Sequence, residues 1–219
     1  FAINSNEKKS SRAERIALRT QEHLKLVIVS LFFAILMGVP LGILAAKKRG
    51  AGKIILGLTG AIQTIPSLAL LVVLIKPLNM LGLTGIGDTP ALIALFLYSL
   101  LPIVRGAHVG FQQIPLALRE TSEVIGLSRQ SQLFKIDLPL ALPTILSGIK
   151  TAAVINVGFA TLGALVGAGG YGQSILTGIR LDDYPLILEG AIPSAVLALV
   201  VQQLFDLLET YLVSPGLRK

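Results

Sequence analysis

The sequence predicts an all-α polytopic membrane protein with about five transmembrane helices. Of its 219 residues, 53% are hydrophobic and 14% are charged, and the mean hydropathy is +0.77. Soluble domains carry about 25% charged residues, so this chain has too few charged side chains to cover a water-soluble fold. Long apolar runs separated by polar segments are the second observation, because about 20 mainly apolar residues cross about 30 Å of hydrocarbon.

Five segments meet this length requirement. The predicted spans are residues 24–46, 54–75, 90–110, 145–168 and 186–208. The first carries one charge, Lys25, near its end, and the fourth carries Lys150 near its start. The spans fill one predicted membrane domain, residues 24–214, between a basic polar N-terminal tail (1–23) and a C-terminal tail (215–219).

Basic residues between the spans predict the orientation. Lysines and arginines gather in the link between spans one and two, in the loop between spans three and four, and at the C-terminus, as Lys47, Lys48, Arg49, Lys53, Arg105, Arg119, Arg129, Lys135, Arg218 and Lys219. The positive-inside rule makes these segments cytoplasmic. The N-terminal tail is basic too and disagrees with this assignment. Either a further segment precedes it, or it forms an amphipathic surface helix with its own partner.

The sequence lacks the residues that several kinds of nucleotide, metal and catalytic sites require. No phosphate-binding loop is present, since the nearest approach, 50–54, lacks the leading glycine and the Ser/Thr ligand. The G-x-G-x-x-G run at 167–172 follows a membrane span, which favours a flexible or re-entrant turn over a dinucleotide site. Two distant histidines and the absence of cysteine leave no predicted metal site, catalytic cluster or cofactor on this chain.

The polar loop at residues 113–140, between spans three and four, is too long for a turn. Its pattern predicts a helix that begins at Pro115 and stops at Gly126, followed by a second amphipathic stretch over 128–137. The pattern alone leaves two alternatives open: a solvated linker, or a cytoplasmic surface whose apolar side chains enter a partner's groove.

The spacing inside this loop resembles a known family. Glu120-Thr121-Ser122, Gly126 and Ile136-x-Leu138-Pro139 look like the EAA loop of binding-protein-dependent ABC importer permeases, whose pattern is Glu-Ala-Ala, three residues, Gly, nine residues, Ile-x-Leu-Pro. Small Thr121 and Ser122 replace the two alanines. Further segments resemble the permeases of osmoprotectant uptake systems, which import glycine betaine, carnitine, choline or similar quaternary amines: 38–42, 62–69, 99–103, 138–143 and 190–193.

The resemblance implies a transport subunit that catalyses no covalent chemistry. Two permease subunits, identical copies or sisters, would pack around a pathway, an extracytoplasmic binding protein or fused binding domain would deliver the substrate, and ATP with Mg²⁺ would bind a separate cytoplasmic ATPase. It implies localisation in the bacterial inner membrane and no nucleic-acid partner. The residues expected to couple the ATPase are Glu120, Thr121, Ser122, Gly126, Ile136, Leu138 and Pro139.

The pathway is expected to be lined by polar or backbone-exposing positions within spans. The first choice is Gln63, Thr64, Pro66 and Ser67 of the second span, because proline frees a carbonyl one turn back. Asn156 is the second choice, with interhelical packing as the alternative for each residue. The chain has no tryptophan, so we expect no cation–π cage here and place substrate selectivity in the binding protein.

Two other functions remain as alternatives. An ATP-independent carrier or channel would need coupling charges or a selectivity ring within the spans, and the apolar span centres lack both. A membrane scaffold that transports nothing would show no substrate-stimulated ATP hydrolysis in its complex.

Overall fold

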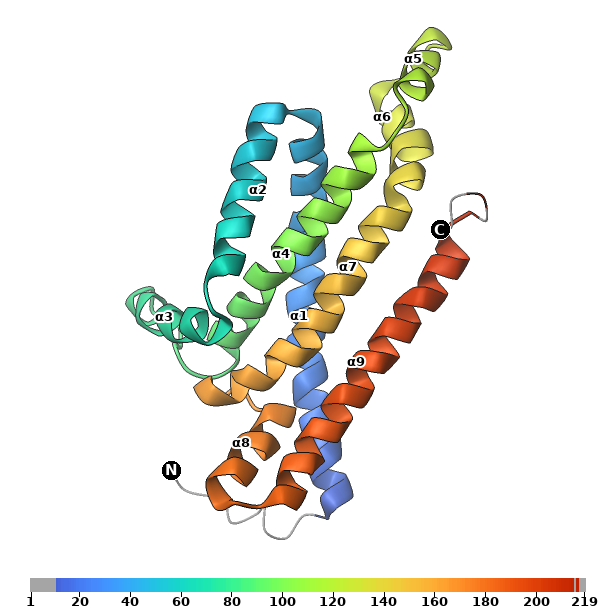
Figure 1. Ribbon diagram of the computed structural model, residues 1–219. Helices are drawn as coiled ribbons and strands as arrows, with labels where there is room; N and C mark the ends of the chain where they lie inside the picture. Colours follow the sequence, from blue (N-terminus) through green and yellow to red (C-terminus); the bar gives the residue numbers. More distant parts are fainter. Residues whose placement is uncertain (1–10, 215, 217–219) are drawn as a thin grey trace. The chain divides into compact units, whose positions relative to one another are not determined.

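The computed structural model describes residues 11–214 and 216, and every regular element within them is helical (Figure 1). The elements are α1 (Arg12–Lys47), α2 (Arg49–Thr64), α3 (Ser67–Met80), α4 (Asp88–Gln112), α5 (Leu116–Val124), α6 (Arg129–Gln132), η1 (Leu133–Asp137), α7 (Leu138–Ala160), η2 (Thr161–Val166), α8 (Tyr171–Leu181) and α9 (Tyr184–Leu212). The all-α prediction is confirmed. The chain divides into two compact units, and the long helices α1, α4, α7 and α9 each contribute residues to both.

Unit 1 comprises Phe1–Leu31, Ile65–Phe96 and Val154–Val200. Glycines bring its helices into backbone contact. A Cβ built on Gly172 of α8 would overlap the carbonyl of Thr161 in η2, and one on Gly178 would lie 2.7 Å from the backbone nitrogen of Ile187 in α9. Small residues permit such approach between helices in a membrane protein, so the glycines set how α8 packs within this unit.

Unit 2 comprises Phe32–Thr64, Leu97–Ala153 and Val201–Lys219. Its α4 and α7 segments also pack backbone to backbone: a Cβ on Gly106 would lie 3.0 Å from the Cα of Gly148. A Cβ on Gly42 of α1 would lie 2.6 Å from the carbonyl oxygen of Val104 in α4. An ion pair between Lys150 and Asp206 joins α7 to α9.

In the part of the chain that the structure describes, four helical segments are long and apolar enough to cross a membrane alone: Arg12–Lys47, Asp88–Gln112, Arg129–Val166 and Tyr184–Leu212. A fifth span is reached if the bent pair α2 and α3 counts as one. The predicted span 54–75 is interrupted, because this pair bends by 101° at the break over Ile65 and Pro66. Proline lacks an N–H, and its ring disfavours helical geometry in the residue before it.

The first and fourth helical segments differ in extent from the predicted spans. Helix α1 begins at Arg12, well before residue 24. Helix α7 ends at Ala160 and continues as the 3-10 helix η2 to Val166. The predicted turn after it is confirmed, since Gly167, Gly169 and Gly170 all have positive φ angles of 72–81°. Glycine adopts that conformation without the steric penalty of a Cβ.

Candidate functional site

The predicted helix at the start of the polar loop is confirmed as α5. Pro115 occupies the position before the helix, and Gly126 follows its C-cap with a φ of 75°. The N–H of Leu127 donates to the Ser122 carbonyl at 3.0 Å, and the N–H of Gly126 donates to the Glu123 carbonyl at 3.0 Å. This pair of bonds is the Schellman motif, which requires a left-handed residue at the position of Gly126. The motif glycine therefore ends α5 and turns the chain.

The second arm of the loop is continuous with the fourth apolar segment. Ser128 caps α6, its hydroxyl accepting from the Ser131 N–H at 3.2 Å. The π-helix η1 follows, and the Leu138 N–H donates to the Leu133 carbonyl across five residues. Pro139, one residue further on, has no N–H to donate. Single π turns within α-helices are frequent at functional sites, and this one precedes Leu138-Pro139 of the motif.

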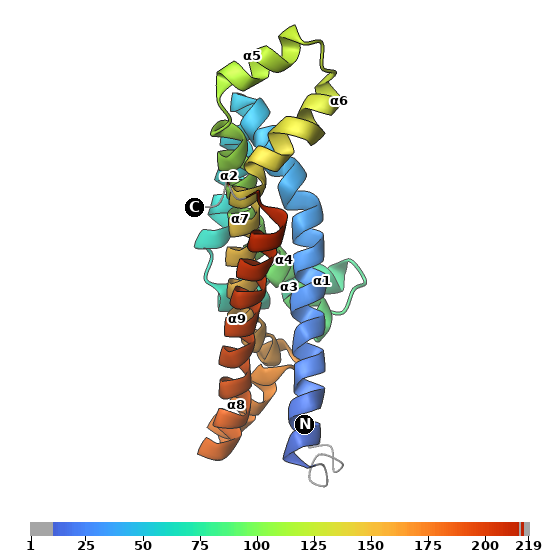
Figure 2. The same cartoon turned by 90° about the vertical axis from the view of Figure 1, so that its right-hand side faces the viewer.

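Figures 1 and 2 show α5 and α6 as two arms beyond the ends of α4 and α7 in unit 2. Of the motif residues, Ser122 is buried and Ile136 and Leu138 are half-buried. Glu120, Thr121, Gly126 and Pro139 are exposed. The two arms also expose large apolar side chains, namely Leu116, Leu118, Val124, Ile125 and Phe134. Val124 is 85% exposed and Phe134 65%. Clustered exposed apolar side chains beside charged ones are typical of a docking surface.

An ion pair that the sequence analysis missed joins the arms. Arg119 Nε lies 3.5 Å from Asp137 Oδ1, and the Asp137 side chain is 6% exposed. Arg119 also donates from Nη2 to the Phe111 carbonyl of α4 at 2.9 Å. The sequence holds one signal of it, an acid in the variable position of the Ile-x-Leu-Pro motif, but nothing in the spacing indicates which cation faces it.

The proposed pathway residues are divided between the two units. In unit 2, half-buried Gln63 donates from Nε2 to the Tyr98 carbonyl at 3.3 Å, and exposed Thr64 bonds back to its own helix. In unit 1, exposed Pro66 and half-buried Ser67 form the start of α3. Asn156 is fully buried, and its Nδ2 donates to Ser30 Oγ at 3.1 Å. The geometry of Asn156 is that of the interhelical packing alternative.

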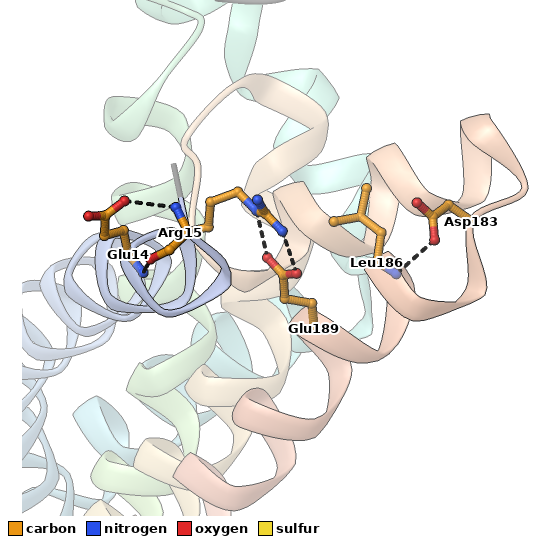
Figure 3. A network of polar contacts seen from close by, with 6 residues as sticks. Glu14, Arg15, Asp183, Leu186 and Glu189 are labelled. Carbon is orange, nitrogen blue, oxygen red and sulfur yellow. Dashed lines mark hydrogen bonds and ion pairs between the residues drawn. The ribbon is translucent and has the colours of Figure 1, made fainter. Parts of the chain in front are cut away.

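The N-terminal part of α1 forms a polar network within unit 1 that the sequence analysis also missed. Arg15 makes a bidentate ion pair with Glu189 of α9, at 3.0 Å from Nε and 2.9 Å from Nη2 (Figure 3). Thr20 accepts from the Tyr171 hydroxyl at 2.8 Å. Lys25 pairs with Asp88 at 2.6 Å. These contacts give Arg15 and Lys25 a structural role that is independent of membrane orientation.

Further along the same face, α1 supports the glycine turn. The Glu22 carboxylate accepts the Gly170 N–H at 2.8 Å and pairs with Arg19 at 3.0 Å. The ring of His23, fully buried, stacks on Tyr171 with centroids 4.6 Å apart. The glutamate-capped glycine turn is therefore a structural element of unit 1.

The polar end of α1 also lines a cavity of about 710 Å³ in unit 1. Its acidic residues, Glu22 and Asp88, are both ion-paired with basic residues of α1. Within residues 11–214 and 216, no three His, Cys, Asp or Glu side chains are grouped to hold a metal ion.

Comparison with known proteins supplies the family. Residues 38–214 match the family described as the binding-protein-dependent transport system inner membrane component. The osmoprotectant import permease protein OsmW of Salmonella typhimurium is 39% identical over 93% of this chain and 94% of its own length. The choline transport system permease protein OpuBB of Bacillus subtilis is 37% identical over 92% of this chain and 90% of its own.

A solved structure shares the fold. An inward-facing structure of the MetNI methionine ABC transporter aligns with a TM-score of 0.79 at 24% identity, covering 91% of this chain and 97% of that one. Because the family model matches residues 38–214, most of the chain, this chain belongs to the binding-protein-dependent transport system inner membrane components.

Proposed function

We propose that this chain is the permease subunit of an ATP-driven importer that passes a quaternary-amine osmoprotectant, such as glycine betaine, carnitine or choline. The observation that carries the proposal is the loop α5–Gly126–α6–η1, which presents the family motif on two arms with exposed apolar side chains. Relatives named as osmoprotectant and choline permeases support the substrate class.

The loop is the part of the chain that docks the cytoplasmic ATPase. Val124, Ile125 and Phe134 expose apolar surface that a groove on the partner would bury. Glu120 and Thr121 are exposed on α5. Gly126 turns the chain between the arms, and η1 connects the second arm to α7. ATP and Mg²⁺ bind the ATPase, because this sequence carries no phosphate-binding loop.

The proposed topology is five spans in the bacterial inner membrane, with α2 and α3 together forming the second. The coupling loop lies at 113–140 of the membrane domain, and residues 12–23 of the expected N-terminal tail are the first turns of α1. The coupling loop and the C-terminus are cytoplasmic, supported by Lys47, Lys48, Arg49 and Lys53 in the first link and by basic residues in the loop.

The residues proposed to line the substrate pathway belong to the end of α2 and the start of α3. At the break between these two helices Pro66 interrupts the helix, and unpaired backbone groups are tolerated at membrane depth only beside protein or water. Gln63, Thr64 and Ser67 supply polar groups on either side of it. Asn156 is a packing residue in this proposal, since its side chain is buried against α1. A second permease copy or a sister permease completes the pathway, and a binding protein or fused binding domain selects the substrate.

Reconstitution in proteoliposomes with the ATPase and the binding protein tests the proposal. We expect labelled glycine betaine to accumulate only with internal ATP, and Glu120→Ala to abolish both ATPase co-purification and uptake. The matched control is Glu123→Ala, which removes the same charge from the same helix outside the motif. Uptake in vesicles without the ATPase would refute the proposal in favour of a secondary carrier or channel. ATP hydrolysis unaffected by any loaded binding protein would favour a scaffold.

A further inference from the structure

Asp137 is an unusual residue to find buried in the coupling loop. It occupies the variable position of the Ile-x-Leu-Pro motif, at the last residue of η1, and its side chain is 6% exposed. Its Oδ1 atom accepts no hydrogen bond within the described part of the chain. A buried carboxylate without a compensating cation costs several kcal/mol, so the charge that faces it is a required part of the loop.

That charge is Arg119 of α5, which contacts two further elements of unit 2, η1 and α4. The residue lies on α5, its Nε faces Asp137 of η1 at 3.5 Å, and its Nη2 donates to the Phe111 carbonyl at 2.9 Å. Phe111 is in the last turn of α4, where carbonyls lack helical partners. Arg119 Nε faces Asp137 as an ion pair without a hydrogen bond, and Nη2 supplies the hydrogen bond to α4. The planar guanidinium directs these nitrogens toward different partners, so one side chain joins both arms of the loop to α4.

The helices on which the loop stands already pack as one body in unit 2. A Cβ on Gly106 of α4 would lie 2.7 Å from the Thr144 carbonyl oxygen, and a Cβ on Gly110 would lie 2.9 Å from the Ala141 carbonyl oxygen, both of α7. Apart from Arg119, α5 is joined to this pair through the residues before Pro115, through the Gly126 turn and through the packing that buries Ser122. Rotation of α5 about the two backbone joints is the movement that the Arg119 contacts oppose.

We propose that Arg119 is a positioning residue that locks α5 to α4 and η1, so that the coupling loop moves as one rigid lever. This inference rests on the proposed function of the loop. With the lock in place, a displacement of α5 by the ATPase moves α4 and α7 together. Without it, the displacement is absorbed by rotation of α5 about its two joints, and ATP is hydrolysed with less transport.

The variants must distinguish a positioning role of Arg119 from simple neutralisation of the Asp137 charge. Arg119→Ala leaves the carboxylate buried and uncompensated, so instability alone could explain its phenotype. The informative variant is Arg119→Ala combined with Asp137→Asn, which removes the buried charge and also the link. Arg119→Lys is the second informative variant, because an ammonium keeps the charge but lacks the fork that reaches both partners. Arg49→Ala, an exposed arginine at the start of α2, is the matched control.

Two measurements on the full complex are needed. The chain contains no cysteine, so spin labels at Gly50→Cys on α2 and at Ala117→Cys, an exposed position of α5 outside the docking surface, report the position of α5 within unit 2. Imported glycine betaine per ATP hydrolysed reports the coupling. We expect the double variant and Arg119→Lys to broaden the distance distribution and to lower import per ATP roughly 2- to 30-fold, the range of measured coupling energies. The ATPase should still co-purify, and Arg49→Ala should leave both values unchanged.

The outcomes separate this inference from the function it rests on. If the double variant restores a narrow distribution and normal import per ATP, Arg119 only neutralises Asp137 and the lock is refuted. If the double variant does not fold, unchanged values for Arg119→Lys refute it equally. If cysteine crosslinking from Val124→Cys fails to capture the ATPase in the otherwise native complex, the proposed docking itself is wrong.

Discussion

Replacing Gly126 with alanine tests whether the backbone turn, and not the side chain, is what the motif glycine provides. A Cβ built at this position meets no atom within 4 Å, so the substitution introduces no clash. Its φ of 75° lies in the left-handed region, which costs a residue with a Cβ about 1–2 kcal/mol. That free energy corresponds to roughly a 5- to 30-fold lower population of the bent loop relative to its alternatives.

The assay is titration of the purified ATPase onto the permease in nanodiscs, paired with uptake in proteoliposomes. When only the bent loop binds, the apparent affinity falls by the fraction of permease that holds the bend, so the Kd should rise by at most that 5- to 30-fold factor. Gly126→Asn should recover much of the affinity, because asparagine tolerates the left-handed conformation.

The matched control is Gly57→Ala in α2, where a Cβ also meets nothing within 4 Å but the backbone is helical. Alanine there should raise helix stability by about 1 kcal/mol and leave ATPase binding unchanged. Equal Kd values for Gly126→Ala, Gly57→Ala and the native chain would refute the reasoning.

Three further expectations concern the packing of unit 1. Glu189→Gln should lower the free energy of unfolding by about 2–3 kcal/mol, because it removes the buried carboxylate that pairs with Arg15. The measurement is the melting temperature in detergent, which should fall. An unchanged melting temperature would contradict this prediction. Gly172→Ala should prevent folding, because its Cβ would overlap a carbonyl of η2. Gly158→Ala is the control and should fold normally, because the space around its Cβ is open. Equal yields of folded protein for the two variants would contradict this prediction. Asn156→Ala should lower the free energy of unfolding by about 1 kcal/mol. The substrate dependence of uptake should stay unchanged, because the side chain is buried against α1. An altered Km for glycine betaine would instead indicate that Asn156 lines the pathway.

The ends of α5 were predictable because they depend on local chemistry. Pro115 and Gly126 lie where the sequence pattern puts them, since a proline at a helix start and a glycine past a helix end act through their own φ angles. The sequence shows a proline at position 66, but its apolar pattern predicts one continuous span over residues 54–75. Proline within a helix is compatible with either a kink or a full break, and neighbouring segments decide between them.

The pairing of charges was not predictable. Arg119 and Asp137 are separated by 18 positions, and Arg15 and Glu189 by 174. Their types are those of ordinary surface or snorkelling residues, so nothing in the local pattern indicates a buried partner. The same holds for Lys25, which the pattern places at a span end and the structure pairs with Asp88.

By itself the sequence determined that this chain is a membrane protein, that its informative polar segment lies between the third and fourth spans, and that this segment carries the family motif. Those features depend on composition, on run length and on spacing along one chain, which are all local quantities. The tertiary structure decided that α5 is tied to η1 and α4 through Arg119, that Asn156 is buried, and that the basic start of α1 is bound to α9. These are contacts between residues distant in sequence, and only packing in three dimensions selects them.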